Sequence, residues 1–189
     1  LEDVSADWHR LWLDGPACKD VLGCQVPGEG VVEEDQGSIL LASSRCGAVG
    51  CDVLVTTDEA RAHWARLLEA GAQPIGWYAL NMARIEAWAP LFMIDYDTSS
   101  LPHETGVIAS HVAFDKGCYI GQEVVARMES RGKWGRSLVG LSLQDQRLPV
   151  AGAQVWATQG SPMDDPAGTV TSSCPSPMSG GQAIALAMV

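Results

Sequence analysis

The most informative segment of this chain runs from residue 116 to residue 123 and reads Lys116-Gly117-Cys118-Tyr119-Ile120-Gly121-Gln122-Glu123. Cys118 stands just before a helix that we expect to begin near Gly121 and to end at Arg131. A helix N-terminus carries partial positive charge from its unpaired N–H groups, and Lys116 adds a full charge nearby. Both favour the thiolate, the nucleophilic and metal-ligating form of cysteine. Two interpretations follow from the residues alone: a reactive or ligating cysteine, and a structural cysteine buried under the helix.

The same region is basic within an acidic protein. The formal net charge of the chain is −11, which argues against broad nucleic-acid binding. Arg127 and Arg131 are four residues apart, so they share one helix face and, with Lys116, could hold a carboxylate or a phosphate. The alternatives are a solvated helix face and a simple i, i+4 ion pair between Glu123 and Arg127. Residues 116–147 hold six of the twelve basic side chains: Lys116, Arg127, Arg131, Lys133, Arg136 and Arg147.

Length and composition predict a globular protein without a membrane span. The 189 residues are 47% apolar, and no apolar run approaches the roughly 18 residues that a membrane helix needs. The N-terminus has no signal-peptide pattern and no Met, so we expect a piece of a longer protein.

No C-x-x-C pair occurs, so we expect no metal site built by this chain alone. We expect a reducing cytoplasm, with most cysteines acting as small apolar residues: Cys18, Cys24, Cys46, Cys51 and Cys174.

The first 135 residues predict an α+β domain. Strands are expected at 8–13, 39–42 and 49–56, the last two as a hairpin, with a loop at 25–37. Helices are expected from about 16 to 22, from an Asp58 cap to about 70, and at 77–88. The order strand, helix, strand, strand, helix is typical of a split βαβ, ferredoxin-like unit.

Residues 136–189 predict a separate all-β domain. Short apolar runs at 138–143, 154–157, 169–172 and 183–189 are separated by Gly-, Pro- and Ser-rich turns, which favours a small barrel. We therefore expect domains at 1–135 and 136–189.

Glu86 is the second candidate site residue. It lies near the end of the expected 77–88 helix, which carries few other charges. One carboxylate can accept two adjacent N–H donors, such as those of a pterin ring, in a bidentate contact. An ion pair with Arg84 or an exposed position is the simpler interpretation.

The segment around Cys118 resembles the K-G-C-[FY]-x-G-Q-E signature of the YgfZ family, folate-binding relatives of the glycine-cleavage T-protein, an aminomethyltransferase. Further matches follow in order along nearly the whole chain: Arg45, Gly47 and Gly50 resemble R-x-G-x-x-G, Arg84-Ile85-Glu86-Ala87 resembles R-[IL]-E-A, Leu101-Pro102-His103-Glu104 resembles L-P-H-E, Gly168-Thr169-Val170-Thr171-Ser172 resembles G-x-V-T-S, and Ile184-Ala185-Leu186-Ala187 resembles I-A-L-A.

This resemblance implies a T-protein-like α+β fold, with a ferredoxin-like folate-binding region followed by a C-terminal β-barrel. It implies that Glu86 holds the pterin of tetrahydrofolate and that Arg127 and Lys116 belong to the ligand or partner surface. Cys118 matches the signature cysteine of the YgfZ branch, which the aminomethyltransferases lack. Trp88 departs from the pattern, because the family commonly has Gly there, and its ring could narrow the folate pocket or stack on the pterin.

Two functions follow from the resemblance. The first is a folate-binding accessory factor that uses Cys118 to support iron–sulfur enzymes or assembly factors, and thereby tRNA thiolation. The second is a folate-dependent aminomethyltransferase or demethylase, whose catalytic aspartate would lie upstream of this segment. Direct tRNA binding through residues 116–136 is a third interpretation, which the charge of −11 disfavours.

Overall fold

The computed structural model describes residues 2–28, 31–35, 37–157 and 165–189. The chain forms two compact units, Leu1–Ala83 and Arg84–Val189. The domain boundary that the sequence predicts after residue 135 is a different division and stays a prediction. No helix among the described residues is long and apolar enough to cross a membrane.

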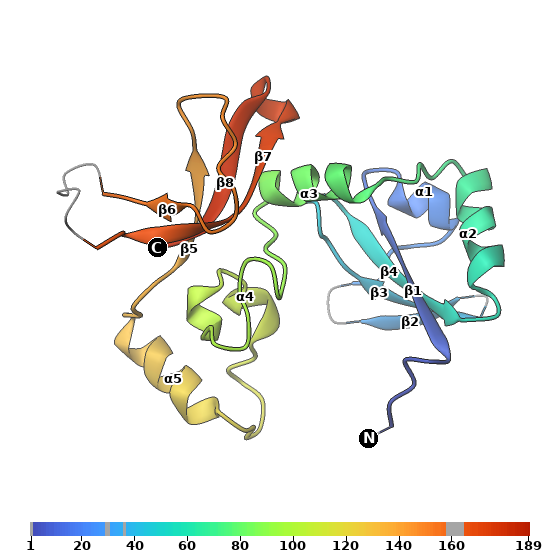
Figure 1. Cartoon of the computed structure of the whole chain (residues 1–189). Helices are drawn as coiled ribbons and strands as arrows, with labels where there is room; N and C mark the ends of the chain where they lie inside the picture. Colours follow the sequence, from blue (N-terminus) through green and yellow to red (C-terminus); the bar gives the residue numbers. More distant parts are fainter. Residues whose placement is uncertain (1, 29–30, 36, 158–164) are drawn as a thin grey trace. The chain divides into compact units, whose positions relative to one another are not determined.

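The first unit contains a four-stranded antiparallel sheet in the order β1-β4-β3-β2 (Figure 1). Two helices and the start of a third accompany it. The elements are β1 (Trp8–Asp14), α1 (Cys18–Leu22), β2 (Val32–Asp35), β3 (Ser38–Ala42), β4 (Gly50–Thr56), α2 (Ala60–Glu69) and α3 (Trp77–Glu86).

Strand alternation gives this sheet one apolar face, on which both helices pack. Val53 and Val55 of β4 point to that face together with Leu11 of β1, because successive side chains of a strand point to opposite sides. Cys18 of α1 and Leu67 of α2 complete the buried cluster. Burial of these apolar groups is the main stabilising contribution to this unit.

The opposite face of the sheet carries a charged and aromatic cluster. Asp52 of β4 forms ion pairs with Arg10 and with Arg45, whose Nη2 lies 3.3 Å from Oδ2 of the aspartate. The Arg45 guanidinium carbon stands 4.1 Å from the ring centroid of Trp12, a cation–π distance. Gly50 is required beside this cluster, since a Cβ there would lie 2.2 Å from the backbone O of Ser43 and 2.3 Å from a carboxylate oxygen of Asp14. Arg45 and Gly50 of the R-x-G-x-x-G match therefore have a structural role in the first unit.

The predicted hairpin is confirmed, since Leu40 of β3 pairs with Val53 of β4 in antiparallel register. The prediction of a loop through 25–37 is wrong for Val32–Asp35, which pair with β3 as an edge strand; residues 29, 30 and 36 lie outside the described residues. The Asp58 cap is also wrong: α2 begins at Ala60 with Glu59 at the N-cap position and no side-chain cap. The Glu59 carboxylate instead accepts a hydrogen bond from Thr56 Oγ1 at 2.8 Å.

The second unit combines short helices with an antiparallel sheet in the order β5-β8-β7-β6, which curls as a half-barrel (Figure 1). The predicted barrel strands and the helix before them are confirmed, whereas α4 was not expected. The elements after α3 are η1 (Pro102–Glu104), α4 (Ile108–His111), α5 (Gln122–Arg131), β5 (Leu138–Ser142), β6 (Gln154–Val155), β7 (Gly168–Ser176), η2 (Pro177–Ser179) and β8 (Gln182–Met188).

A buried ion pair joins the end of α3 to this half-barrel. Arg84 Nη1 donates to Asp95 Oδ2 at 2.7 Å, and the two side chains are 1% and 0% exposed. Arg84 Nη2 donates to Ser172 Oγ on β7, also at 2.7 Å. Asp95 further accepts from Leu91 N, Thr171 Oγ1 and Ser172 Oγ. The carboxylate therefore has a donor for each of its roughly four lone-pair sites, which a buried charge requires.

Removing the cation from this pair should destabilise the second unit strongly. Arg84→Met retains an unbranched apolar stem but leaves Asp95 buried without a counter-ion, so we expect a loss of about 3–5 kcal/mol in the free energy of unfolding. Urea denaturation followed by circular dichroism measures it.

Arg147→Met is the matched control. It removes the same charge from an ion pair with Asp145 whose side chains are 92% and 53% exposed. Solvent screens that pair, so we expect no measurable change. Equal destabilisation by the two substitutions would contradict a special role for the buried pair.

Candidate functional site

Glu86, the last residue of α3, is half-buried and contacts the half-barrel. Its Oε1 accepts a hydrogen bond from Ser176 Oγ at 2.6 Å and another from the backbone N of Met178 at 3.0 Å. Its Oε2 has no hydrogen-bond partner among the described residues. The ion pair with Arg84 that the sequence left open does not form, because Arg84 pairs with Asp95 instead. The carboxylate thus accepts two hydrogen bonds at Oε1 and none at Oε2 among the described residues.

Asp95 and Ser176 carry no signal in the sequence, although Ser176 contacts Glu86 and Asp95 binds Arg84, two residues before it. Asp95 lies in a stretch that the sequence marks only as polar and turn-rich, and Ser176 lies 90 residues beyond Glu86. Neither has a local pattern that distinguishes it from other polar loop or strand residues. The only sequence signals nearby are the R-[IL]-E-A and G-x-V-T-S matches.

Trp88 lies on the half-barrel, and its backbone has an uncommon conformation for a non-glycine residue. Its φ is 57°, in the left-handed region. The ring packs over Gly140 of β5 so closely that a Cβ at Gly140 would lie 2.1 Å from a ring carbon. The residue as a whole is nonetheless 57% exposed. The absence of a side chain at Gly140 therefore makes room for the ring of Trp88 on the half-barrel.

Cys118 is exposed and lies in the loop that precedes α5. The buried structural interpretation is therefore wrong for this cysteine. Lys116 Nζ stands 5.0 Å from the ring centroid of Tyr119, a weak cation–π contact within the same loop. Ile120 beside it is fully exposed. The loop presents a thiol, a cation and an apolar side chain to solvent.

Arg127 is an exposed residue of α5. Within the described part of the chain it forms no ion pair with Glu123, so that simple alternative is not supported. Lys116 and Cys118 are exposed in the loop before α5 and Arg127 is exposed on α5, and no described hydrogen bond or ion pair links any of them to Glu86. The four predicted site residues therefore lie in different places. Glu86 contacts the half-barrel, whereas Lys116, Cys118 and Arg127 lie in the loop before α5 and on α5 itself.

The L-P-H-E residues connect η1 to α5 and to the segment after it. His103 Nε2 lies 3.1 Å from Glu129 Oε2 of α5, and the imidazole packs on Trp134 with ring centroids 5.5 Å apart. Glu104 Oε2 accepts from Arg136 Nε at 3.0 Å. These contacts fix α5, and with it the end of the Cys118 loop, to the second unit.

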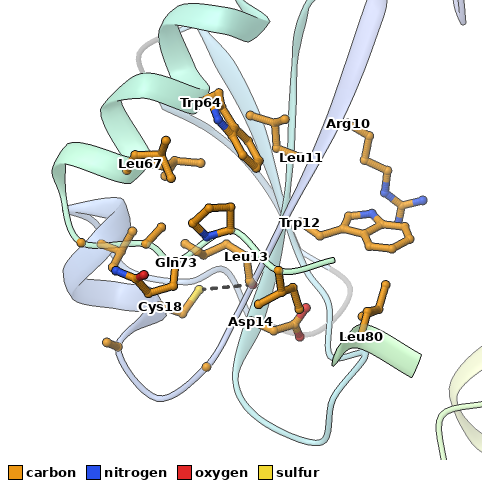
Figure 2. A pocket seen from close by; sticks show the side chains of 18 of the residues that line it. Arg10, Leu11, Trp12, Leu13, Asp14, Cys18, Trp64, Leu67, Gln73 and Leu80 are labelled. Carbon is orange, nitrogen blue, oxygen red and sulfur yellow. Dashed lines mark hydrogen bonds between the residues drawn. The ribbon is translucent and has the colours of Figure 1, made fainter. Parts of the chain in front are cut away.

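A large cavity that the sequence did not predict lies in the first unit. Its volume is ≈ 1070 Å³, just above the roughly 300–1,000 Å³ typical of ligand pockets. Figure 2 shows Leu11 and Leu13 of β1 facing Trp64 and Leu67 of α2 across it, with Cys18 of α1 at one side. None of the four predicted site residues is among its described lining residues.

Burial separates the other cysteines from Cys118. Desolvation raises the pKa of the Cys18 thiol to about 11 and that of Cys51 to about 11. It also raises the pKa of Cys24, Cys46 and Cys174. No disulfide is present among the described residues. These five thiols therefore behave as small packing groups, as the sequence predicts.

Comparisons with known proteins agree with this fold. Residues 136–189 match the family described as the glycine cleavage T-protein C-terminal barrel domain. The chain is 32% identical over 200 aligned residues to a protein named aminomethyltransferase from Rubrobacter xylanophilus, covering 100% of this chain and 52% of that protein. It matches the crystal structure of glycine cleavage system aminomethyltransferase T from Bartonella henselae with a TM-score of 0.76 and 24% identity, over 96% of this chain and 51% of that one.

Residues 136–189 therefore match the T-protein barrel domain, and the protein has a T-protein-like fold. The chain spans about half the length of the relatives that it matches.

The structure predicts a clear order of cysteine reactivity. Thiolate is the reactive form, and a thiol with a pKa of about 11 is almost entirely protonated near pH 8. We expect iodoacetamide to modify Cys118 first in the folded protein and to leave Cys18 and Cys51 unmodified. Peptide mass spectrometry over a time course measures the rates.

A parallel reaction in concentrated urea is the control, since unfolding should make all six cysteines react at similar rates. Modification of Cys18 or Cys51 as fast as that of Cys118 in the folded protein would contradict the assignment.

Proposed function

We propose that this chain is the tetrahydrofolate-binding part of a protein that transfers a one-carbon unit, of the aminomethyltransferase type. The observation that carries the proposal is the 32% identity, along the whole chain, to a protein named aminomethyltransferase. The likeness of fold to a second aminomethyltransferase is consistent with it. The chain corresponds to about half of each matched relative, and the activity of a whole protein of this type would also use the other half.

The residues around Glu86 fit a pterin. A pterin ring presents a ring N–H and an amino group on one edge, both of them donors. Glu86 Oε2 is an acceptor without a partner among the described residues, on a half-buried side chain fixed at its other oxygen. Bound tetrahydrofolate would supply the amine nitrogens that accept the one-carbon unit. The role of Glu86 would be to hold and orient the ring, with Lys116 and Arg127 as candidates for the anionic tail.

A second candidate function is supported by the exposed Cys118. An aminomethyltransferase role does not account for a thiol presented in this loop. A folate-binding accessory factor for iron–sulfur enzymes or assembly factors, and thereby for tRNA thiolation, would use Cys118 to ligate iron or to exchange with a partner. A reducing cytoplasm suits both functions, because it would keep the thiol of Cys118 reduced. Direct nucleic-acid binding is disfavoured by the charge of −11.

Calorimetry tests the proposed folate contact. We expect Glu86→Ala to weaken tetrahydrofolate binding at least tenfold, because a charge-assisted hydrogen bond contributes about 1.5–3 kcal/mol. Glu69→Ala, which removes an exposed carboxylate from the end of α2, is the control and should bind as the wild type does. Equal affinity of Glu86→Ala and wild type would contradict the contact, and absence of binding by the wild type would contradict the proposed function.

Complementation tests the second function and separates it from the first. In a strain lacking the full protein, Cys118→Ser should lose the iron–sulfur enzyme activity that the wild type restores, while Cys46→Ser should restore it. Cys46 is half-buried with a raised pKa, so it serves as the unreactive counterpart. If Cys118→Ser restores activity fully while one-carbon transfer to tetrahydrofolate is detected in vitro, only the first function survives.

A further inference from the structure

The half-barrel holds one specific oxygen of Glu86. Ser176, at the end of β7, is 2% exposed, and its hydroxyl donates to Oε1 at 2.6 Å. The backbone N–H of Met178 donates to the same oxygen at 3.0 Å. Ser176 Oγ in turn accepts from the backbone N of Ser179 at 3.1 Å, so the serine caps η2 while it binds the carboxylate. These contacts form one connected set at the start of η2.

The donors at Oε1 determine what Glu86 can offer a ligand. A carboxylate oxygen has about two lone-pair positions, and Ser176 and Met178 fill both positions on Oε1. Oε2 has no partner within the described residues. A bidentate contact that used both oxygens would therefore have to displace a charge-assisted hydrogen bond of the half-barrel. Recognition through Oε2 alone displaces none.

We propose that Ser176 and the Met178 amide are positioning groups that reserve Oε1 for the half-barrel, so that Glu86 binds the pterin donors through Oε2 only. The inference rests on the proposed function and specifies how that site recognises its ligand. Holding Oε1 removes the rotational freedom of the carboxylate before binding, which lowers the entropic cost of forming the ligand contact. Ligand specificity at this site then depends on the half-barrel as well as on Glu86.

Ser176 and the Met178 amide both donate to Oε1, so one substitution at residue 86 can test the proposal. An amide N–H can only donate, and the Ser176 hydroxyl donates its single proton to residue 86. In Glu86→Gln the side-chain oxygen must therefore take the Oε1 position. The NH₂ group is then placed where Oε2 was, and a donor faces the donors of the ligand. The substitution should preserve the contact with the half-barrel and remove the contact with the ligand.

The experiment measures thermal unfolding and tetrahydrofolate affinity for wild type and four variants of the full chain. Glu86→Gln should unfold close to the wild-type midpoint, while Glu86→Ala unfolds at a lower temperature. Glu86→Gln should bind tetrahydrofolate at least tenfold more weakly. Ser176→Ala should weaken binding severalfold, because the carboxylate loses one of its two anchors.

Ser173→Ala is the matched control for the serine. Ser173 is also on β7, and its hydroxyl donates to Pro149 O at 2.7 Å, away from Glu86. Its removal should change the unfolding midpoint but not the affinity for tetrahydrofolate.

Three outcomes would overturn the inference. They are unchanged binding by Glu86→Gln, unchanged or tighter binding by Ser176→Ala, and an unfolding midpoint of Glu86→Gln as low as that of Glu86→Ala. Tighter binding by Ser176→Ala would mean that the serine competes with the ligand for Oε1. If the wild type binds no tetrahydrofolate, the proposed function fails, and the unfolding midpoints alone still decide whether the half-barrel holds Oε1.

Discussion

The buried ion pair between Arg84 and Asp95 is the constraint on which the second unit depends. Two opposite charges removed from water are tolerated only when their remaining donors and acceptors are also satisfied. Here Ser172 of β7 bonds to both partners, and Leu91 and Thr171 fill the other positions on the carboxylate. The end of α3, the segment that follows it and the longest strand of the half-barrel must therefore adopt one arrangement together.

That arrangement places Glu86 and Trp88, which lie between Arg84 and Asp95 in the sequence. Glu86, two residues after Arg84, reaches the start of η2, where two donors meet its Oε1. Trp88 follows with a positive φ, a conformation that costs a non-glycine residue free energy and is retained only where surrounding contacts stabilise it. Its packing over Gly140 is such a contact. The half-barrel thus fixes a candidate ligand-binding carboxylate through η2 and accommodates the Trp88 ring over β5.

The exposed region around Cys118 is positioned by contacts other than the Arg84–Asp95 pair. It is fixed to the second unit by η1, through His103 to Glu129 and Trp134 and through Glu104 to Arg136. The loop itself remains open to solvent, so Cys118 can meet a partner, whereas burial makes Cys18 and Cys51 poor nucleophiles. The chain therefore carries both the carboxylate of Glu86 and the exposed thiol of Cys118. Of the two candidate functions, only the accessory function uses the thiol.

The sequence by itself determined the helices and strands that have a strong hydrophobic periodicity or are bounded by glycines. The strand at Trp8, the hairpin at Leu40 and Val53 and the helix between Gly121 and Gly132 follow from local backbone preference and side-chain alternation. The edge strand Val32–Asp35 could not be predicted, because acidic residues lack a strand pattern and depend on pairing with β3. Only the tertiary structure decided which groups meet Glu86. Asp95 and Ser176 act through contacts between distant segments, and no local pattern distinguishes a serine that donates to a carboxylate 90 residues away.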